Sequence, residues 1–151
     1  MGNRYLFKAK RLDNGEWVQG VPFKIEGKIV ILINDNENIL RVHYLEENMW
    51  EADIYAVEVD PSTICQCTGL RDKNGKLIWE NDIAKFDVYY YEKLESSIIS
   101  QIKWCNDLCT LSLVVNDRGT RGTLGHLMDL NKEIEVIGNI FDNPELLESE
   151  G

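Results

Sequence analysis

The chain alternates apolar and polar residues along much of its length, and short glycine-containing turns interrupt the alternation. A period of two places successive side chains on opposite faces of a strand, so it predicts half-buried β-strands rather than helices. Asn14-Gly15, Glu26-Gly27 and Asn74-Gly75 separate such runs. Because glycine, and asparagine before it, tolerate the positive φ of tight hairpins, these dipeptides predict β-hairpins. The sequence is therefore predicted to fold mainly as β-structure.

Two segments are predicted within the 151 residues, a length that suits one domain or two small packed halves. Residues 1–60 form an N-terminal β-hairpin segment, and Asp60-Pro61 reads as a turn that ends it. Residues 61–151 follow, with a small SH3-like β-barrel over about residues 65–141. A few short helices are expected, one after Asn143. Residues 46–57 fit either a helical turn or an irregular connection, and residues 92–97 are predicted as a loop.

The net charge of −10, from 26 acidic and 16 basic residues, constrains the partners. Non-specific nucleic-acid binding depends on Lys and Arg neutralising phosphates, so this chain has the wrong sign for it. The same charge disfavours anionic membrane surfaces. No apolar run approaches the roughly 20 residues of a membrane span, and the first residues lack the apolar core of a signal peptide. We expect a soluble, cytoplasmic protein with a protein partner, no membrane and no cofactor.

Four cysteines raise the question of a metal site: Cys65, Cys67, Cys105 and Cys109. In a cytosolic chain they should be thiols. Tetrathiolate zinc sites usually show pairs spaced C-x2-C to C-x4-C, and the first pair here is C-x-C, with no histidine close by. Free cysteine often packs as a small apolar residue. We therefore predict half-buried or core cysteines and no metal.

Glu80, Asp82 and Asp87 are candidate catalytic carboxylates. Glu80 and Asp82 would lie about 7 Å apart on one side of an ideal strand, and glycosidases use carboxylate pairs at such separations. In a chain this acidic, close pairs are expected by chance, and Asp82 better fits a hydrogen bond to turn amides. His43 and His126 are too scattered to indicate a nucleophilic triad.

A basic, glycine-containing loop lies at residues 118–122, where backbone N–H groups could approach an anion. It lacks the Lys-Ser/Thr pair that completes a P-loop, so a surface loop is the better interpretation. The four tryptophans fit a core better than a stacking platform, since the basic groove of a single-stranded nucleic-acid binder is missing.

Two long motifs resemble one known family. "TGLRDKNGKLIWENDI" at residues 68–83 and "EVIGNIFDNPELL" at residues 135–147 are similar to the central and C-terminal motifs of the YopX family, found mainly in bacteriophages and prophages. The resemblance implies a phage-derived bacterial protein with a mostly β fold, and it brings no enzyme activity or cofactor. The family usually has glycine where this chain has Asn81, and an aromatic residue near Cys67.

The unusual residues of these motifs are predicted to shape the backbone and not to act on a ligand. They are the turn, bend and cap residues Gly69, Asp72, Asn74, Gly75, Asn81, Asp82 and Gly138. The leading hypothesis is a non-enzymatic phage accessory protein that binds protein, as a homo-oligomer or with a phage or host protein. The alternatives are a nucleic-acid-binding small barrel and a carboxylate-dependent hydrolase.

Overall fold

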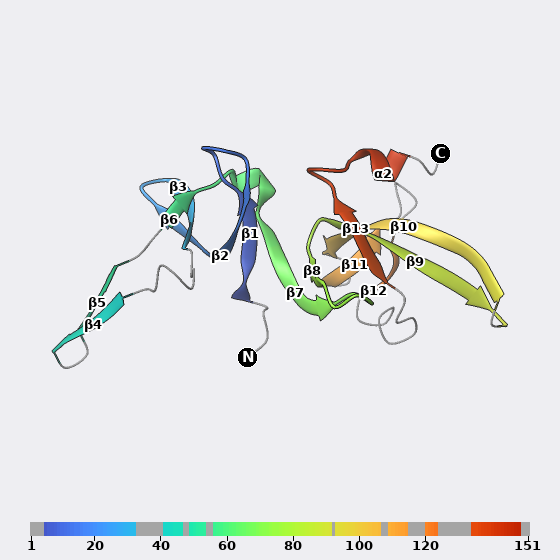
Figure 1. Ribbon diagram of the computed structural model, residues 1–151, viewed down its shortest axis with the longest axis horizontal. Helices are drawn as coiled ribbons and strands as arrows, with labels where there is room; N and C mark the ends of the chain where they lie inside the picture. The colour runs from blue at the N-terminus through green and yellow to red at the C-terminus, as the bar shows by residue number, and fades with distance from the viewer. Residues whose placement is uncertain are drawn as a thin grey trace. The chain divides into compact units, whose positions relative to one another are not determined.

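The computed structural model is shown in Figure 1. It describes residues 5–32, 41–46, 49–53, 56–91, 93–106, 109–114, 120–123 and 134–148. The chain divides into two compact units, Met1–Gln66 and Cys67–Gly151. This division lies inside a strand, six residues beyond the Asp60-Pro61 turn at which the sequence was divided. Strands dominate both units, which confirms the prediction of a mainly β protein.

Unit 1 is built on antiparallel strands in the order β6-β3-β2-β1. The strands are β1 (Phe7–Lys10), β2 (Trp17–Ile25), β3 (Lys28–Leu32) and β6 (Ala56–Glu58). Glu26 and Gly27 join β2 to β3 with φ of 48° and 82°. Two successive positive φ values define a type I′ turn, whose twist matches that of the flanking strands. The Glu26-Gly27 turn is thus a two-residue hairpin.

Strand β2 is continuous through Pro22, although proline is rare inside strands. Its first half pairs with β1 up to Phe7 opposite Gly20, and its second half pairs with β3 from Val21 onward. After a two-residue turn, the backbone N–H and C=O groups of the odd residues of β2 bond to β3. The same groups of the even residues point to the other edge of β2. Pro22 has no N–H to donate and Lys24 is charged, so both suit this edge beyond β1.

The core of unit 1 lies on the inner face of these strands. Ala9, Val18, Ile31 and Val59 are buried, with Ile29 and Ile64 packed against them. The 3-10 turn η2 (Pro61–Thr63) follows β6 along the chain. Asp60 Oδ1 accepts from the Ser62 N–H at 2.9 Å and starts the turn, and Thr63 Oγ1 accepts from the Lys10 N–H at 2.8 Å. These side-chain bonds tie η2 to β1.

The described residues between 46 and 57, for which the sequence left two interpretations open, lie in strands. Strand β5 (Met49–Asp53) pairs with β4 (Arg41–Glu46) in a two-stranded antiparallel sheet, from Arg41 opposite Asp53 to Glu46 opposite Met49. Strand β6 follows and pairs with β3. The helical turn considered for this region is therefore wrong. Acidic and amide residues between the apolar ones obscured the period of two.

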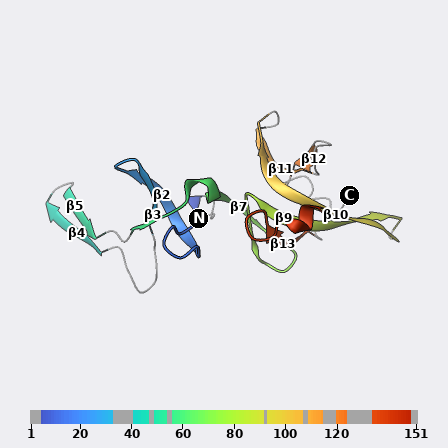
Figure 2. The ribbon, with the colours of Figure 1, turned by 90° about the horizontal axis from the view of Figure 1, so that it is seen from above.

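Unit 2 holds the remaining strands and one short helix. They are β7 (Cys65–Arg71, from Cys67 on), β8 (Leu77–Trp79), β9 (Asp82–Tyr90), β10 (Lys93–Cys105), β11 (Thr110–Val114), β12 (Thr120–Thr123), β13 (Glu135–Asn139) and α2 (Glu145–Glu148). Strand β7 pairs with β8, and five strands form an antiparallel sheet in the order β12-β11-β10-β9-β13. The long β9–β10 hairpin is prominent in Figures 1 and 2.

This sheet corrects two sequence expectations. Residues 93–97 belong to β10, so the loop predicted over residues 92–97 is wrong for this part; the tight turn at Tyr91, with φ of 47°, leaves them free to pair with β9. The SH3-like barrel is not confirmed, since β12 and β13 are the outer strands of the sheet in the described residues.

The core of unit 2 lies on one face of this sheet. It consists of Ile78, Ala84, Phe86, Ile102, Ile134 and Val136, with Leu70, Ile98 and Leu111 packed against it. Val136 lies opposite Ala84 on β9, and Ile98 opposite Phe86. Directly opposed residues project to the same face, which explains how distant segments share this core.

Gly20 is required for steric reasons that the sequence does not reveal. A Cβ atom there would lie 1.9 Å from the carbonyl oxygen of Leu32. We expect Gly20→Ala to lower the free energy of unfolding by about 2–3 kcal/mol, because backbone must move to relieve the overlap. Gly27→Ala meets no neighbouring atom within 4 Å and strains only its φ of 82°, at about 1 kcal/mol. Urea denaturation of both variants tests this; equal losses would contradict the steric explanation.

Candidate functional site

The motif at residues 68–83, here called the signature stretch, is organised around the carboxylate of Asp72. Asp72 is 7% exposed, and its Oδ1 accepts from the N–H groups of Asn74 and Lys76, both at 2.9 Å. Its Oδ2 accepts from the N–H of Val136 at 3.0 Å, 64 residues further along the chain. One side chain therefore shapes the β7–β8 turn and joins it to β13.

The rest of the turn adds to this connection. The Lys73 N–H donates to the Ile134 carbonyl at 2.9 Å, and Lys73 Nζ lies 2.6 Å from Glu135 Oε2. Gly75 has φ of 81° and donates its N–H to the Asp72 carbonyl at 2.9 Å. Lys73 and Asp72 thus hold three successive residues at the start of β13.

Burial by itself would raise the pKa of the Asp72 carboxyl. The N–H groups of Val136, Lys76 and Asn74 bond to its charged form and outweigh this, with a smaller contribution from the positive charge of Lys76, so the pKa lies below the ordinary value of 3.8. Hydrogen bonds to a carboxylate favour ionisation because only the charged form accepts all of them. Asp72 is therefore an ionised structural acceptor at neutral pH.

Gly69 and Asn81 occupy left-handed backbone on either side of β8. Gly69 has φ of 78° where the pairing of β7 with β8 is irregular between Cys67 and Arg71. Asn81 has φ of 67°, donates its N–H to the Ile102 carbonyl at 2.7 Å and accepts from Gln101 Nε2 at 2.9 Å. Asparagine is among the few non-glycine residues that adopt this conformation readily. The bend after β8 thus rests on Asn81.

The carboxylates considered for hydrolysis lie in different settings. Asp82 is 2% exposed, and its Oδ2 accepts from the Trp79 N–H at 2.8 Å. Asp87 accepts from Ser97 Oγ on the neighbouring strand, and Glu80 is partly exposed in the turn. Asp82 and Asp87 are five positions apart on β9, so alternation directs them to opposite faces. Asp82 serves the local backbone, and β9 separates it from Asp87.

Gly138 lies at an irregularity between β13 and β9, just before the tail turn. A Cβ on Gly138 would lie 2.6 Å from Asn143 Oδ1. Asn139 Oδ1 accepts from the N–H groups of Phe141 and Asp142, each at 3.0 Å. The "GN" of the tail motif therefore makes room for Asn143 and caps the turn that leads into α2.

The cysteines are placed as core and hairpin residues. Cys65 and Cys67 are buried on β7, Cys105 is half-buried and Cys109 is exposed with φ of 48°. Within the described residues, no group of three or more His, Cys, Asp or Glu side chains comes close enough to hold a metal ion. Residues 120–122 of the predicted basic loop belong to β12, so the loop prediction is wrong for this part. His126, Arg118 and Gly119 lie outside the described residues.

An exposed row of apolar side chains on β2 escaped the sequence reasoning. Val21, Phe23 and Ile25 are 51%, 56% and 43% exposed and share one face, here called the apolar ridge. Three large apolar residues on one open face differ from the singly scattered ones found on most surfaces. Strict alternation gives the same pattern whether the apolar face is covered or open, so the sequence carried no signal for exposure.

Lysines flank the apolar ridge. On β1, Lys8 and Lys10 lie opposite Gln19 and Trp17 and so project to the ridge's face. Their Nζ atoms lie 5.0 and 5.5 Å from the centroid of the Trp17 ring, within cation–π range. Lys28, opposite Ile25, pairs with Glu58 at 2.9 Å. The ridge therefore has ammonium groups at both ends.

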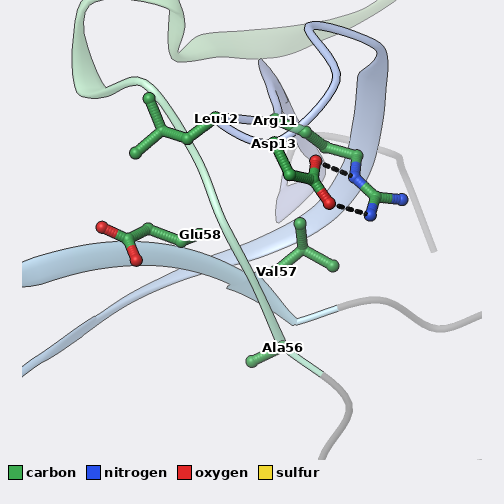
Figure 3. A pocket seen from close by; sticks show the side chains of 6 residues that line it. All are labelled: Arg11, Leu12, Asp13, Ala56, Val57 and Glu58. Atoms are coloured by element: carbon green, nitrogen blue, oxygen red, sulfur yellow. Dashed lines mark hydrogen bonds and ion pairs between the residues drawn. The ribbon is translucent and has the colours of Figure 1, made fainter.

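A shallow depression of about 410 Å³ lies in unit 1, lined by Arg11, Leu12, Asp13, Ala56, Val57 and Glu58 (Figure 3). Arg11 and Asp13 form a two-bond ion pair, at 2.9 and 2.6 Å, along one side of it. The pKa of Asp13 is lowered, chiefly by its hydrogen bond to Arg11. Arg11 and Asp13 are paired with each other and Glu58 is paired with Lys28, so the charges that line the depression already have partners.

These features define a two-unit, mainly β protein with structural motifs and one open apolar face. The family model of the YopX protein matches residues 6–148, nearly the whole chain. The chain belongs to the YopX family, which confirms the resemblance of the two motifs.

Comparison of structures finds a protein with a similar fold. The crystal structure of protein EF1440 from Enterococcus faecalis matches with a TM-score of 0.56 and 23% identity, over 93% of this chain and 96% of that chain. A likeness at this identity shows a shared fold. No curated protein matches the chain. None of the helices in the described part is long and apolar enough to cross a membrane.

Removing the Asp72 carboxylate should destabilise unit 2. Asp72→Ala leaves the buried Val136 N–H and two turn N–H groups without their acceptor, and we expect the free energy of unfolding to fall by about 3 kcal/mol. Glu145→Ala removes an exposed carboxylate of α2 and should stay within about 0.5 kcal/mol. Chemical denaturation followed by tryptophan fluorescence provides the measurement. Similar losses in both variants would show that Asp72 has no special role.

The same carboxylate should make stability depend on pH. Because its pKa is lowered on folding, the folded state binds fewer protons than the unfolded chain, so the contribution is complete above the ordinary value of 3.8. It is lost as pH falls through the lower, folded pKa. Asp72→Asn should flatten the slope of unfolding free energy against pH below about pH 4. Denaturation curves at a series of acidic pH values test this, and an unchanged slope would contradict it.

Proposed function

We propose that this YopX-family chain is a non-enzymatic accessory protein that acts by binding another protein through the apolar ridge. The observation that carries the proposal is the exposure of Val21, Phe23 and Ile25 on one face of β2. Burying apolar surface drives most protein association, and contiguous exposed apolar residues with a polar rim mark interaction surfaces.

The geometry of the ridge supports this use. Phe23 is the middle residue of the row, and the strand beneath it is fixed on one side by five opposed residue pairs with β3. A central aromatic residue on a rigid element is the common form of an interface hot spot. The neighbouring depression, floored by Leu12, Ala56 and Val57, offers a recess on the same unit.

Other parts of the chain support a binding role better than catalysis. Asp72 and Asp82, the buried carboxylates of the signature stretch, accept hydrogen bonds from backbone amides. Such bonds hold both carboxylates in place, and at Asp72 they favour the charged form and lower the pKa. A phage or prophage origin, a bacterial cytoplasmic location and a homo-oligomeric state stay predictions of this proposal.

A charge placed at the centre of the ridge should abolish partner binding. Phe23 is 56% exposed, so Phe23→Lys should cost little thermal stability. Partner recovery should drop about tenfold or more, as for a hot-spot residue. Trp104→Lys is the matched control, because Trp104 is 48% exposed in unit 2. Affinity purification from bacterial lysate with quantitative mass spectrometry compares the three proteins. Proteins retained equally by wild type and the Phe23 variant would exclude the ridge as the binding surface.

A further inference from the structure

We infer that Asn74, in the turn between β7 and β8, is a site of spontaneous covalent modification: the next peptide nitrogen and water convert its side-chain amide into aspartate or isoaspartate. This inference is independent of the apolar ridge and of the proposed function. It is carried by the contrast between the two Asn-Gly turns of the chain, Asn14-Gly15 and Asn74-Gly75. One turn holds its asparagine amide in place, and the other does not.

The reaction needs no reagent besides water. The backbone nitrogen of Gly75 gives up its proton and attacks the side-chain carbonyl carbon of Asn74, so that a carbon–nitrogen bond forms and an imide ring closes. The bond from that carbon to Nδ2 breaks, and Nδ2 takes up a proton and leaves as ammonia. Water then opens the ring at either carbonyl, which gives aspartate or an isoaspartate whose backbone runs through the former side chain. Glycine permits the attack because it has no Cβ to obstruct it.

The two asparagine side chains are held differently. Asn14 Nδ2 donates to Glu16 Oε2, and Asn14 Oδ1 accepts from the Glu16 N–H, both at 2.9 Å. These bonds must break before the Asn14 amide can turn to the next peptide nitrogen. Asn74 is exposed and donates its backbone N–H to Asp72, and no hydrogen bond forms at its side-chain amide in the described part of the chain. The Asn74 amide can therefore turn without losing an interaction.

The backbones of the two turns do not account for a difference. Gly15 and Gly75 both have positive φ, 73° and 81°, and an added Cβ would meet no atom within 4 Å at either. Their N–H groups donate to carbonyl oxygens of the turn, that of Arg11 at 3.0 Å and that of Asp72 at 2.9 Å. Each N–H must leave such a bond before it reacts, so the cost is similar. Side chains and charges therefore decide which asparagine reacts faster.

Negative charge lies beside Asn14. The carboxylate of Glu16 is bonded to its amide, while Arg11 and Asp13 pair with each other and add no net charge. The reaction passes through an anionic nitrogen and then an oxyanion, and a neighbouring carboxylate disfavours both. Charge therefore slows the reaction in this turn, as the hydrogen bonds do.

Positive charge lies beside Asn74. Arg71 Nη1 donates to the Gly75 carbonyl oxygen at 2.6 Å, which holds the guanidinium against the reacting dipeptide. Lys76 is exposed next to it, and Lys73 has a carboxylate partner. The carboxylate within this turn accepts from three N–H groups. A fixed positive group stabilises an oxyanion that develops near it, so this turn favours the reaction.

The modification acts on the connection between the β7–β8 turn and β13. Asp72 Oδ1 accepts from the N–H groups of Asn74 and Lys76, which lie on either side of the reacting bond. Isoaspartate adds a methylene group to the backbone between these two donors, so their present spacing on the carboxylate is lost. We therefore expect unit 2 to lose stability as isoaspartate accumulates.

Ageing of the intact protein tests the inference, because the chain contains its own reference site. Purified protein is incubated in mildly alkaline buffer and digested at acidic pH with an endoproteinase that cleaves after glutamate, which places Asn14 in residues 1–16 and Asn74 in residues 59–80. Mass spectrometry measures the conversion of each peptide, and isoaspartyl methyltransferase identifies isoaspartate. We expect Asn74 to convert about tenfold faster than Asn14, which corresponds to about 1.4 kcal/mol of barrier.

Variants and unfolding separate the causes. Glu16→Ala removes a hydrogen bond and a negative charge at Asn14, so conversion there should rise severalfold while Asn74 is unchanged. Lys76→Gln should slow conversion at Asn74. Unfolding in urea should bring the two rates together, because the hydrogen bonds and fixed charges of the turns are lost. Equal rates in the folded protein, or faster conversion of Asn14, would overturn the inference.

Denaturation of aged samples tests the structural consequence. Asn74→Ser cannot undergo the reaction and keeps an exposed polar residue, so ageing should leave its denaturation midpoint unchanged. The wild-type midpoint should fall after the same treatment, in step with the isoaspartate content. A wild-type midpoint that stays constant while Asn74 converts would overturn the link between this site and β13.

Discussion

The ionised carboxylate of Asp72 is the interaction on which unit 2 depends. Two turn amides and the amide of Val136 converge on it, and a buried carboxylate is tolerated only where such donors replace its water. The neighbouring Lys73 adds a backbone bond to Ile134. Because Ile134 and Val136 belong to the core of this unit, the polar turn sets the position of an apolar strand. The signature stretch and the tail motif are therefore held together by the hydrogen bonds of Asp72 and Lys73.

Much of the fold follows from residue types, and the failures have physical causes. The period of two located most strands, and Gly27, Gly75 and Asn81 adopt the positive φ that their side chains permit. The boundary near Lys93 was misplaced because the tight turn at Tyr91 needs no glycine. Sheet closure could not be predicted, since alternation does not say which strands become neighbours.

The candidate site was less accessible to sequence reasoning. The turn around Asp82 suggested that its carboxylate accepts a hydrogen bond from a nearby amide. In the structure the donor is the Trp79 N–H. Val21, Phe23 and Ile25 read like any half-buried strand, because exposure depends on what the rest of the chain covers. The position of Lys8 and Lys10 beside β2 becomes visible only with the strand register.

The 64-residue separation between Asp72 and Val136 has a consequence for synthesis on the ribosome. Strands β7 and β8 emerge well before β13, and chain growth at about 5–20 residues per second leaves them waiting several seconds for it. During that interval the Asp72 side chain can organise its own turn but not the sheet, and the apolar residues that β13 will cover stay open to water. Long-range contacts of this kind slow folding. Nascent unit 2 therefore exposes apolar surface until its last strand arrives.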